Sequence, residues 1–196
     1  MLEANCHFNL TGAKTAAELA GHLIDSLTVA PYVRETYVDV GSGAGFPGIP
    51  VALATDMPVT LIEATAKKAR FLESVLDSLG IRGSVRAQRA ENAAREPAVR
   101  EAFASGTARA VAAAPATAEL LLPFIAVDGV AVFQCGALEP RERISLEDAL
   151  LMLGAHVERE FALDHRRRIL LVRKRTPTPG RFPRRAGIPA KRPLCG

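Results

Sequence analysis

Apolar positions along the chain alternate between two patterns, which predicts strands followed by helices. Short apolar runs at 37–40 and 59–62 are typical of buried strands. Apolar residues at helical spacing occur at 65–79 and, earlier, at 15–30. Alternation of this kind predicts an α/β fold with a mostly parallel, doubly wound sheet and helices on both faces.

The same alternation continues to residue 174. Further strand or helix signals occur at 49–55, 85–87, 109–112, 116–124 and 130–134. Two last strand-like runs, 157–163 and 168–173, predict an antiparallel hairpin at the edge of the sheet. We therefore expect one domain over residues 1–174, in which residues 1–34 form an N-terminal helical part.

After residue 174 the composition changes to a basic, proline-rich segment. Prolines stand at positions 177, 179, 183, 189 and 193. Because neither a helix interior nor a central strand accommodates such prolines, residues 175–196 are predicted to be an extended arm. Two states of the arm remain open, either packed over the domain or ordered only on a partner.

Charge is distributed unevenly between the two parts. The first 164 residues carry 14 Lys and Arg against all 21 Asp and Glu, a formal charge of −7, whereas the last 32 carry 11 Lys and Arg and no acid. A basic end on an acidic body favours contact with a polyanion, since local charge drives phosphate binding. A merely solvated tail is the alternative.

Composition also limits the classes of protein and site. The three cysteines, Cys6, Cys135 and Cys195, are far apart and form no CxxC pair, so no disulfide framework and no metal site is predicted. No apolar run is long enough for a membrane span, and MLEANCHFNL lacks the features of a signal peptide. We expect a cytoplasmic location and no membrane contact.

The stretch DVGSGAGFPG at 39–48 follows the first predicted strand, where doubly wound folds bind ligands. Gly41, Gly43 and Gly45 give a G-x-G-x-G spacing, but Phe46 stands where a dinucleotide fold needs its third glycine. Glu63, at the end of the second strand, can accept hydrogen bonds from both hydroxyls of a ribose. A ribose without a diphosphate is expected, and S-adenosylmethionine fits this description.

Two details of this interpretation stay open. Asp39 precedes the glycines and can place a carboxylate near the ammonium group of the cofactor or near the turn backbone. Alternatively, the glycines serve only a tight turn, and Glu63 only caps the next helix. The glycine cluster and the acid occur together at the spacing that ribose binding needs, which favours the cofactor site.

Longer motifs resemble one family. The runs DVGSGAGFPGIPVALA, LIEATAKKARFLESVLDSLG, QRAENAA and ARAVA are similar to the RsmG (glucose-inhibited division protein B) family of bacterial 16S ribosomal RNA guanine-N7 methyltransferases. FNLTGAK, HLIDSL and the closing FPRRAGIPAKRPL fit the same family. The resemblance covers nearly the whole chain and implies a Rossmann-like class I methyltransferase fold. The start is short for the family, whose pattern would place a further helix before it.

The resemblance also implies cofactor contacts, residue by residue. Gly41 and Phe46 match the loop contacts, Glu63 the ribose acid, Ala90 and Glu91 the pair on the adenine side, and Arg109 an arginine near the transferring methyl. Two positions depart from the family pattern. Ala104 stands where an acid is common, and Cys135 replaces a lysine, so the fine shape of the site is in question more than the reaction.

An RNA partner gives the basic residues a function. The candidate RNA contacts are Arg89, Arg167, Arg168, Arg184, Arg185, Lys191 and Arg192. For Arg89 and Arg109, surface arginines without a role are the alternative. The expected partner is 16S rRNA or the small ribosomal subunit, bound by a monomer. Removal of residues 176–196 is expected to leave cofactor binding nearly intact, unless the arm packs on the domain and its loss unfolds the protein.

The predicted reaction is transfer of a methyl group from S-adenosylmethionine to N7 of a guanine. N7 already carries an available lone pair, so proximity and orientation suffice and no catalytic base is expected. His22, His156 and His165 are isolated and are interpreted as structural or surface groups. Two other functions compete: an RNA-binding or assembly factor with a residual adenosine pocket, and a small-molecule methyltransferase, against which the basic end argues.

Overall fold

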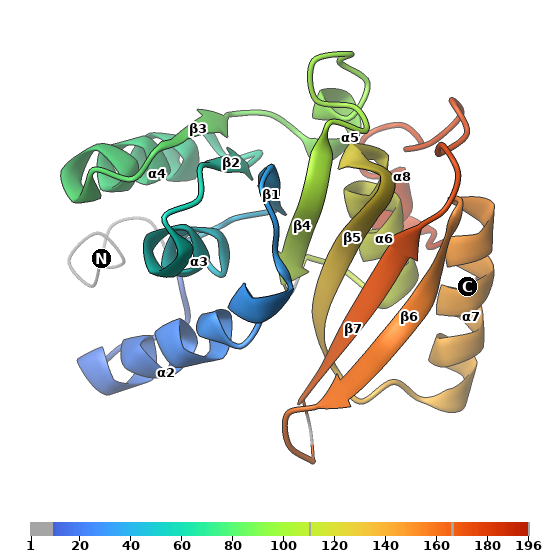
Figure 1. The fold of residues 1–196 in the computed structure, drawn as a ribbon, viewed down its shortest axis with the longest axis horizontal. Helices are drawn as coiled ribbons and strands as arrows, with labels where there is room; N and C mark the ends of the chain where they lie inside the picture. The colour runs from blue at the N-terminus through green and yellow to red at the C-terminus, as the bar shows by residue number, and fades with distance from the viewer. Residues whose placement is uncertain (1–9, 110, 166, 196) are drawn as a thin grey trace.

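The computed structural model describes residues 10–109, 111–165 and 167–195. A seven-stranded sheet has the order β3-β2-β1-β4-β5-β7-β6 (Figure 1). Its strands are β1 (Tyr37–Val40), β2 (Val59–Ile62), β3 (Gly83–Arg86), β4 (Phe103–Arg109), β5 (Ile125–Gly136), β6 (Ala155–Ala162) and β7 (Arg167–Lys174). Strands β1 to β5 pair in parallel, whereas β7 pairs antiparallel with both β5 and β6. The predicted fold class and the edge hairpin are confirmed.

Helices cover both faces of the sheet (Figure 1). The first half contributes α2 (Ala16–Leu27), η1 (Ala30–Tyr32), α3 (Gly48–Thr55), α4 (Ala66–Leu79) and α5 (Ala90–Ala93). The second half contributes α6 (Ala114–Leu121), η2 (Leu122–Phe124), α7 (Pro140–Met152) and α8 (Ile188–Lys191). One buried cluster joins the sheet to α3 and α4, and another joins its opposite face to α6 and α7.

Alternation along β1 shows how the sequence divides these two cores. Val38 and Val40 belong to the cluster on the α6 side, whereas Tyr37 belongs to the cluster on the α3 side. Successive side chains of a strand point to opposite faces, so Asp39 faces the same side as Tyr37. This parity decides below what the Asp39 carboxylate can reach.

Strand β4 lies earlier in the chain than its predicted position. The prediction placed a strand at 109–112, but β4 spans Phe103–Arg109 and ends at that arginine. Its interior contains Gly106, where an added Cβ would lie 2.9 Å from Val38 Cγ1 and 2.7 Å from Ile125 Cδ1. Only small residues fit here, because neighbouring side chains fill the space. A strand built of small residues lacks the apolar run by which a central strand is predicted from sequence.

The proline-rich segment packs on the domain, which is the first of the two predicted alternatives. Phe182 and Leu194 are buried in the core cluster that also contains residues of α6 and α7. Lys174, which is fully buried at the end of β7, donates a hydrogen bond of 2.6 Å to Thr178 Oγ1. Arg100 donates to the backbone oxygens of Thr178 and Phe182 at 2.8 and 3.0 Å. These contacts fix the start of the arm.

Candidate active site

The glycine loop between β1 and α3 uses backbone angles that favour glycine. The φ angles of Gly41, Gly43 and Gly45 are +72°, +56° and +94°. A Cβ at Gly45 would lie 2.6 Å from Ile49 Cδ1, whereas at Gly43 the nearest atom would be the Gly41 carbonyl oxygen at 3.8 Å. The loop is therefore closely packed at Gly45 and has free space beside Gly43.

Glu63 lies at the carboxyl end of β2 and is held by backbone donors. Its Oε2 accepts a hydrogen bond from Gly43 N at 2.9 Å, and its Oε1 accepts one from Thr65 N at 2.7 Å. Thr65 is the N-cap residue of α4, so Glu63 also caps that helix. Each carboxylate oxygen can accept a further bond, so this carboxylate is oriented and still able to bind a hydroxyl.

Asp39 does not point toward the glycine loop's free side. Its carboxylate is fully buried and accepts a hydrogen bond of 2.7 Å from Thr107 Oγ1, its register partner on β4. Tyr37 Oη lies 2.6 Å from the same Thr107 oxygen. Burial raises the pKa of Asp39, against the hydrogen bond from Thr107. Ser42 and the Gly48 backbone, both in the 39–48 stretch, also donate to Asp39 and oppose the effect of burial on its pKa. Of the two predicted positions of Asp39, the structure therefore favours the one at the turn backbone.

A cavity of about 180 Å³ lies beside Glu63. Its lining includes Gly41, Glu63, Ala90, Glu91 and, from the C-terminal arm, Ala190. The structure thus brings together residues from the ends of β1 and β2, from α5 and from α8. Sequence interpretation had selected all of these elements except α8.

Glu91 is nearly fully buried on the adenine side proposed for this cavity. Its carboxylate accepts hydrogen bonds from Arg89 Nη2 at 2.7 Å and from Gly187 N at 2.8 Å. Burial alone would raise the pKa of Glu91, but the bonds from Arg89 and Gly187 outweigh it and hold the pKa below its usual value. Glu91 is therefore an ionised group that joins α5 to the arm.

Arg109 stands at the end of β4, where its guanidinium carbon lies 5.2 Å from the centre of the Phe46 ring. That distance is within the range of a cation–π contact. The Phe46 ring also packs against the His22 ring of α2, with 5.8 Å between the two ring centres. The structure therefore brings Phe46 and Arg109, which were both predicted as site residues, into contact. His22 packs against Phe46 through its ring.

A larger cavity, of about 420 Å³, opens at the carboxyl ends of β4 and β5. Arg109, Ala112, Gln134, Cys135 and Arg167 are among its lining residues. Burial raises the pKa of the Cys135 thiol, which keeps it protonated at neutral pH. The two departures from the family pattern thus differ in position: Cys135 lines this cavity, whereas Ala104, in β4, lines neither cavity.

One short segment separates the two cavities. Val111 lines the smaller cavity and Ala112 the larger one. A Cβ at Gly41 would lie 2.7 Å from Val111 Cγ2, so the glycine loop packs directly on this segment. Both cavities therefore lie against the same short segment after β4.

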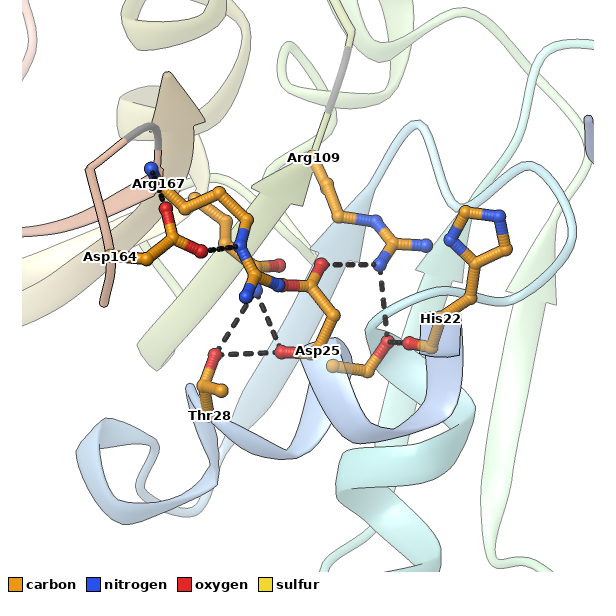
Figure 2. A network of polar contacts seen from close by, with 8 residues as sticks. His22, Asp25, Thr28, Arg109, Asp164 and Arg167 are labelled. Carbon is orange, nitrogen blue, oxygen red and sulfur yellow. Dashed lines mark hydrogen bonds and ion pairs between the residues drawn. The ribbon is translucent and has the colours of Figure 1, made fainter. Parts of the chain in front are cut away.

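Asp25 of α2 connects two arginines of the larger cavity, as Figure 2 shows. Its Oδ2 pairs with Arg109 Nη1 at 3.1 Å, and its Oδ1 pairs with Arg167 Nη1 at 2.6 Å. Gln134 Nε2 donates to the Asp25 carbonyl at 2.7 Å and fixes the end of α2. Sequence interpretation missed Asp25 and Gln134, whose partners lie far away in the chain.

Four of the seven predicted RNA contacts are paired with carboxylates. Arg89 pairs with Glu91, Arg167 with Asp25 and Asp164, Arg168 with Glu160, and Arg184 with Glu119. Arg185, Lys191 and Arg192 are exposed, and no ion pair involves them among the described residues. These three therefore carry exposed charge that no described carboxylate offsets.

The contacts of the arm bear on what its removal would do. Ala190 lines the smaller cavity, Gly187 binds Glu91, and Arg184 pairs with the fully buried Glu119 of α6. Removal of residues 176–196 would open that cavity and leave the Glu119 carboxylate without its partner. This packing favours the predicted alternative, in which loss of the arm destabilises the domain.

Other features of the described residues concern membranes and metals. No described helix is both long and apolar enough to cross a membrane. Within residues 10–109, 111–165 and 167–195, no group of three or more His, Cys, Asp or Glu side chains could hold a metal ion. Cys6 lies outside the described residues, whereas Cys135 and Cys195 are free thiols.

Comparison with known sequences gives one consistent family. The model of the family described as GidB, rRNA small subunit methyltransferase G, matches residues 1–170. Ribosomal RNA small subunit methyltransferase G of Leuconostoc mesenteroides is 37% identical, over 99% of this chain and 87% of its own. The protein of the same name from Rubrobacter xylanophilus is 45% identical, over 91% of this chain and 74% of its own.

Two solved structures with the same fold are methyltransferases with bound cofactor. The T. thermophilus 16S rRNA N2 G1207 methyltransferase, in complex with AdoMet and guanosine, superposes with a TM-score of 0.55 at 18% identity, over 80% of this chain and 40% of its own. The magnesium protoporphyrin IX methyltransferase of Synechocystis PCC 6803, with bound SAM, superposes with a TM-score of 0.59 at 15% identity, over 79% of this chain and 80% of its own. At these identities the likeness concerns the fold.

Proposed function

Because the chain belongs to the rRNA small subunit methyltransferase G family, we propose that it transfers a methyl group from S-adenosylmethionine to N7 of a guanine in 16S rRNA. One observation carries the proposal beyond the family. Two cavities of about 180 and 420 Å³ lie on either side of Val111 and Ala112, at the carboxyl edge of the sheet. A cofactor and a nucleobase can therefore approach each other there.

The residues of the smaller cavity fit the adenosine part of S-adenosylmethionine. Glu63 offers carboxylate oxygens that two backbone N–H groups orient, as a ribose diol requires. Free space beside Gly43 leaves the backbone open to a ligand. Gly41, Ala90 and Glu91 would line the remaining walls. When bound, the cofactor supplies an electrophilic methyl group on a sulfonium.

The residues at the end of β4 would orient the reaction partners. Arg109 and Phe46 lie against each other, and Arg109 lines the larger cavity, where a guanine would enter. Guanine N7 carries a lone pair and no proton, so the protein needs no general base. Asp39 is buried beneath α3 and Glu91 is ionised and held by Arg89, which leaves orientation as the main contribution of the chain.

The RNA contact would combine the domain with the arm. We propose a methyltransferase domain over residues 1–174 and a basic arm over 175–196, which together bind the small ribosomal subunit as a monomer. Arg185, Lys191 and Arg192 supply exposed charge for phosphates, and Arg89 lies at the rim of the smaller cavity. A ribosomal substrate implies that the protein acts in the cytoplasm.

The decisive experiment is methyl transfer with mapping of the product. The protein is incubated with S-adenosylmethionine labelled in the methyl group and with either small ribosomal subunits or deproteinised 16S rRNA. Label at N7 of one guanine supports the proposal, and comparison of the two substrates identifies the form that is methylated. RNA binding without transfer to either substrate would instead establish an RNA-binding or assembly factor.

A further inference from the structure

We propose that the C-terminal arm forms a wall of the cofactor site, on the adenine side, through Gly187 and Ala190. This inference rests on the proposed function, since it assigns the ligand of the smaller cavity as the adenosine part of S-adenosylmethionine. It adds Ala190 as a contact residue and Gly187 as a positioning residue. Neither residue belongs to the methyltransferase sheet or to the loops that follow its strands.

Ala190 supplies the direct contact. It belongs to α8 and lines the smaller cavity together with Glu63, Ala90 and Glu91. Glu63 follows β2, whereas Ala90 and Glu91 belong to α5, so all three lie far earlier in the chain than Ala190. The cavity would be open on this side without α8, so the arm limits the space that an adenine can occupy.

Gly187 supplies a polar connection to the same wall. Its N–H donates to Glu91 Oε1 at 2.8 Å, while Arg89 Nη2 donates to the same oxygen at 2.7 Å. The carboxylate is thus held from α5 on one side and from the arm on the other. Gly187 has a φ of +80°, an angle that favours glycine, so the N–H is aimed by the turn itself.

A buried ion pair fixes this segment on the domain. Arg184 donates from Nε and Nη2 to both carboxylate oxygens of Glu119, at 2.6 to 3.0 Å, and its backbone N–H donates to Glu119 Oε1 at 2.7 Å. Its Nη2 also donates to the Arg192 carbonyl at 2.7 Å, which closes the turn that contains α8. The segment is therefore a fixed wall and not a free tail.

The first test compares two alanines of the arm. Ala190→Phe places a ring at the cavity wall and should raise the Kd for S-adenosylmethionine, measured by calorimetry, by about tenfold or more. Ala186→Phe is the matched control, because Ala186 is exposed in the same segment and does not line this cavity. Equal affinities for the two variants, with unchanged thermal melts, would overturn the inference.

The second test uses the wild-type chain and is independent of folding in a variant. Photolabelling with an S-adenosylmethionine analogue that carries an azide on C8 of adenine is followed by tryptic digestion. Cleavage after Arg185 and Lys191 releases residues 186–191 as one peptide. Label in this peptide, displaced by excess S-adenosylmethionine, supports the wall. Label confined to peptides of residues 39–95 overturns it, whereas absence of any binding by the wild type would contradict the proposed function itself.

Discussion

Arg184 of the arm neutralises Glu119 of α6, a carboxylate with no exposed surface, through hydrogen bonds to both of its oxygens. The pair joins residues 65 positions apart in the chain. The pair explains how a basic segment with five prolines and no acid of its own packs on the domain: Glu119 of α6 supplies the carboxylate that pairs with Arg184. Removal of one partner leaves the other as an uncompensated charge in the core.

We expect Arg184→Met to lower the free energy of unfolding by about 3 kcal/mol, the cost of breaking a buried ion pair from one side. Urea unfolding measures this change. Arg185→Met is the control, since Arg185 is the exposed neighbour in the chain, and it should have little effect. The double variant Arg184→Met, Glu119→Leu should recover part of the loss. An equal effect of the two arginine substitutions would contradict a structural role for the pair.

Glu63→Ala should weaken S-adenosylmethionine binding by about 1.5–3 kcal/mol, the range for hydrogen bonds to a charged group. Calorimetry gives the affinity. A thermal melt should also show some destabilisation, because Gly43 N and Thr65 N lose their acceptor. Glu73→Ala, at an exposed position of α4, should change neither quantity. If the variant melts earlier but binds normally, Glu63 only caps the helix.

Gly43 and Gly80 form a natural pair for separating backbone strain from ligand contact. Their φ angles are +56° and +61°, and no atom lies within 3.4 Å of an added Cβ at either. Valine at either position should lower the free energy of unfolding by about 1–2 kcal/mol, because a β-branched residue disfavours this angle. Only Gly43→Val should weaken cofactor binding in calorimetry. Equal affinity losses would indicate a general effect of destabilisation.

The lowered pKa of Glu91 predicts that the free energy of unfolding falls at acidic pH. Hydrogen bonds from Arg89 and Gly187 outweigh burial and lower its pKa from the usual 4.5. As the pH falls below 4.5, the unfolded chain binds a proton that the folded chain does not, so stability declines until the pH passes the lowered pKa. Glu91→Gln should reduce the slope of the urea-unfolding free energy against pH in this acidic range, whereas Glu73→Gln should leave the slope unchanged.

Much of the fold could be predicted because the informative residues interact locally. The strand, glycine turn and helix at 37–55 have the predicted order, and Gly80 ends α4 as expected. Strand β4 was misplaced because Gly106 and the residues around it are small, and a central strand between large neighbours needs small side chains. Local apolar pattern cannot reveal what the neighbouring strands contribute.

The site shows the same division. Gly41, Glu63 and Ala90 line one cavity, and they follow strand ends that the pattern located. The position of Asp39 was left open, because the sequence alone does not show that Thr107 of the neighbouring strand β4 donates to its carboxylate. Asp25, Glu119 and Ala190 were missed because their partners lie 65 or more positions away, and a single sequence carries no signal for such contacts.

Asp25 allows the orientation of Arg109 to be tested. Asp25→Asn keeps the side-chain volume but removes the charge that holds Arg109 at 3.1 Å and Arg167 at 2.6 Å. Asp164→Asn is the matched control, because Asp164 pairs with Arg167 and makes no ion pair with Arg109 among those that the structure shows.

We expect Asp25→Asn to reduce kcat for rRNA methylation by about tenfold to a hundredfold, since small misplacements of an orienting group are costly, while Asp164→Asn stays near the wild type. Arg109→Ala and the double variant Asp25→Asn, Arg109→Ala should then have similar rates, because Asp25 acts through Arg109 and its loss adds little once that arginine is absent. Single-turnover methylation, with thermal melts of every variant, measures this. Additive losses in the double variant, or equal losses for Asp25→Asn and Asp164→Asn, would show that Asp25 acts on the reaction by a route other than Arg109.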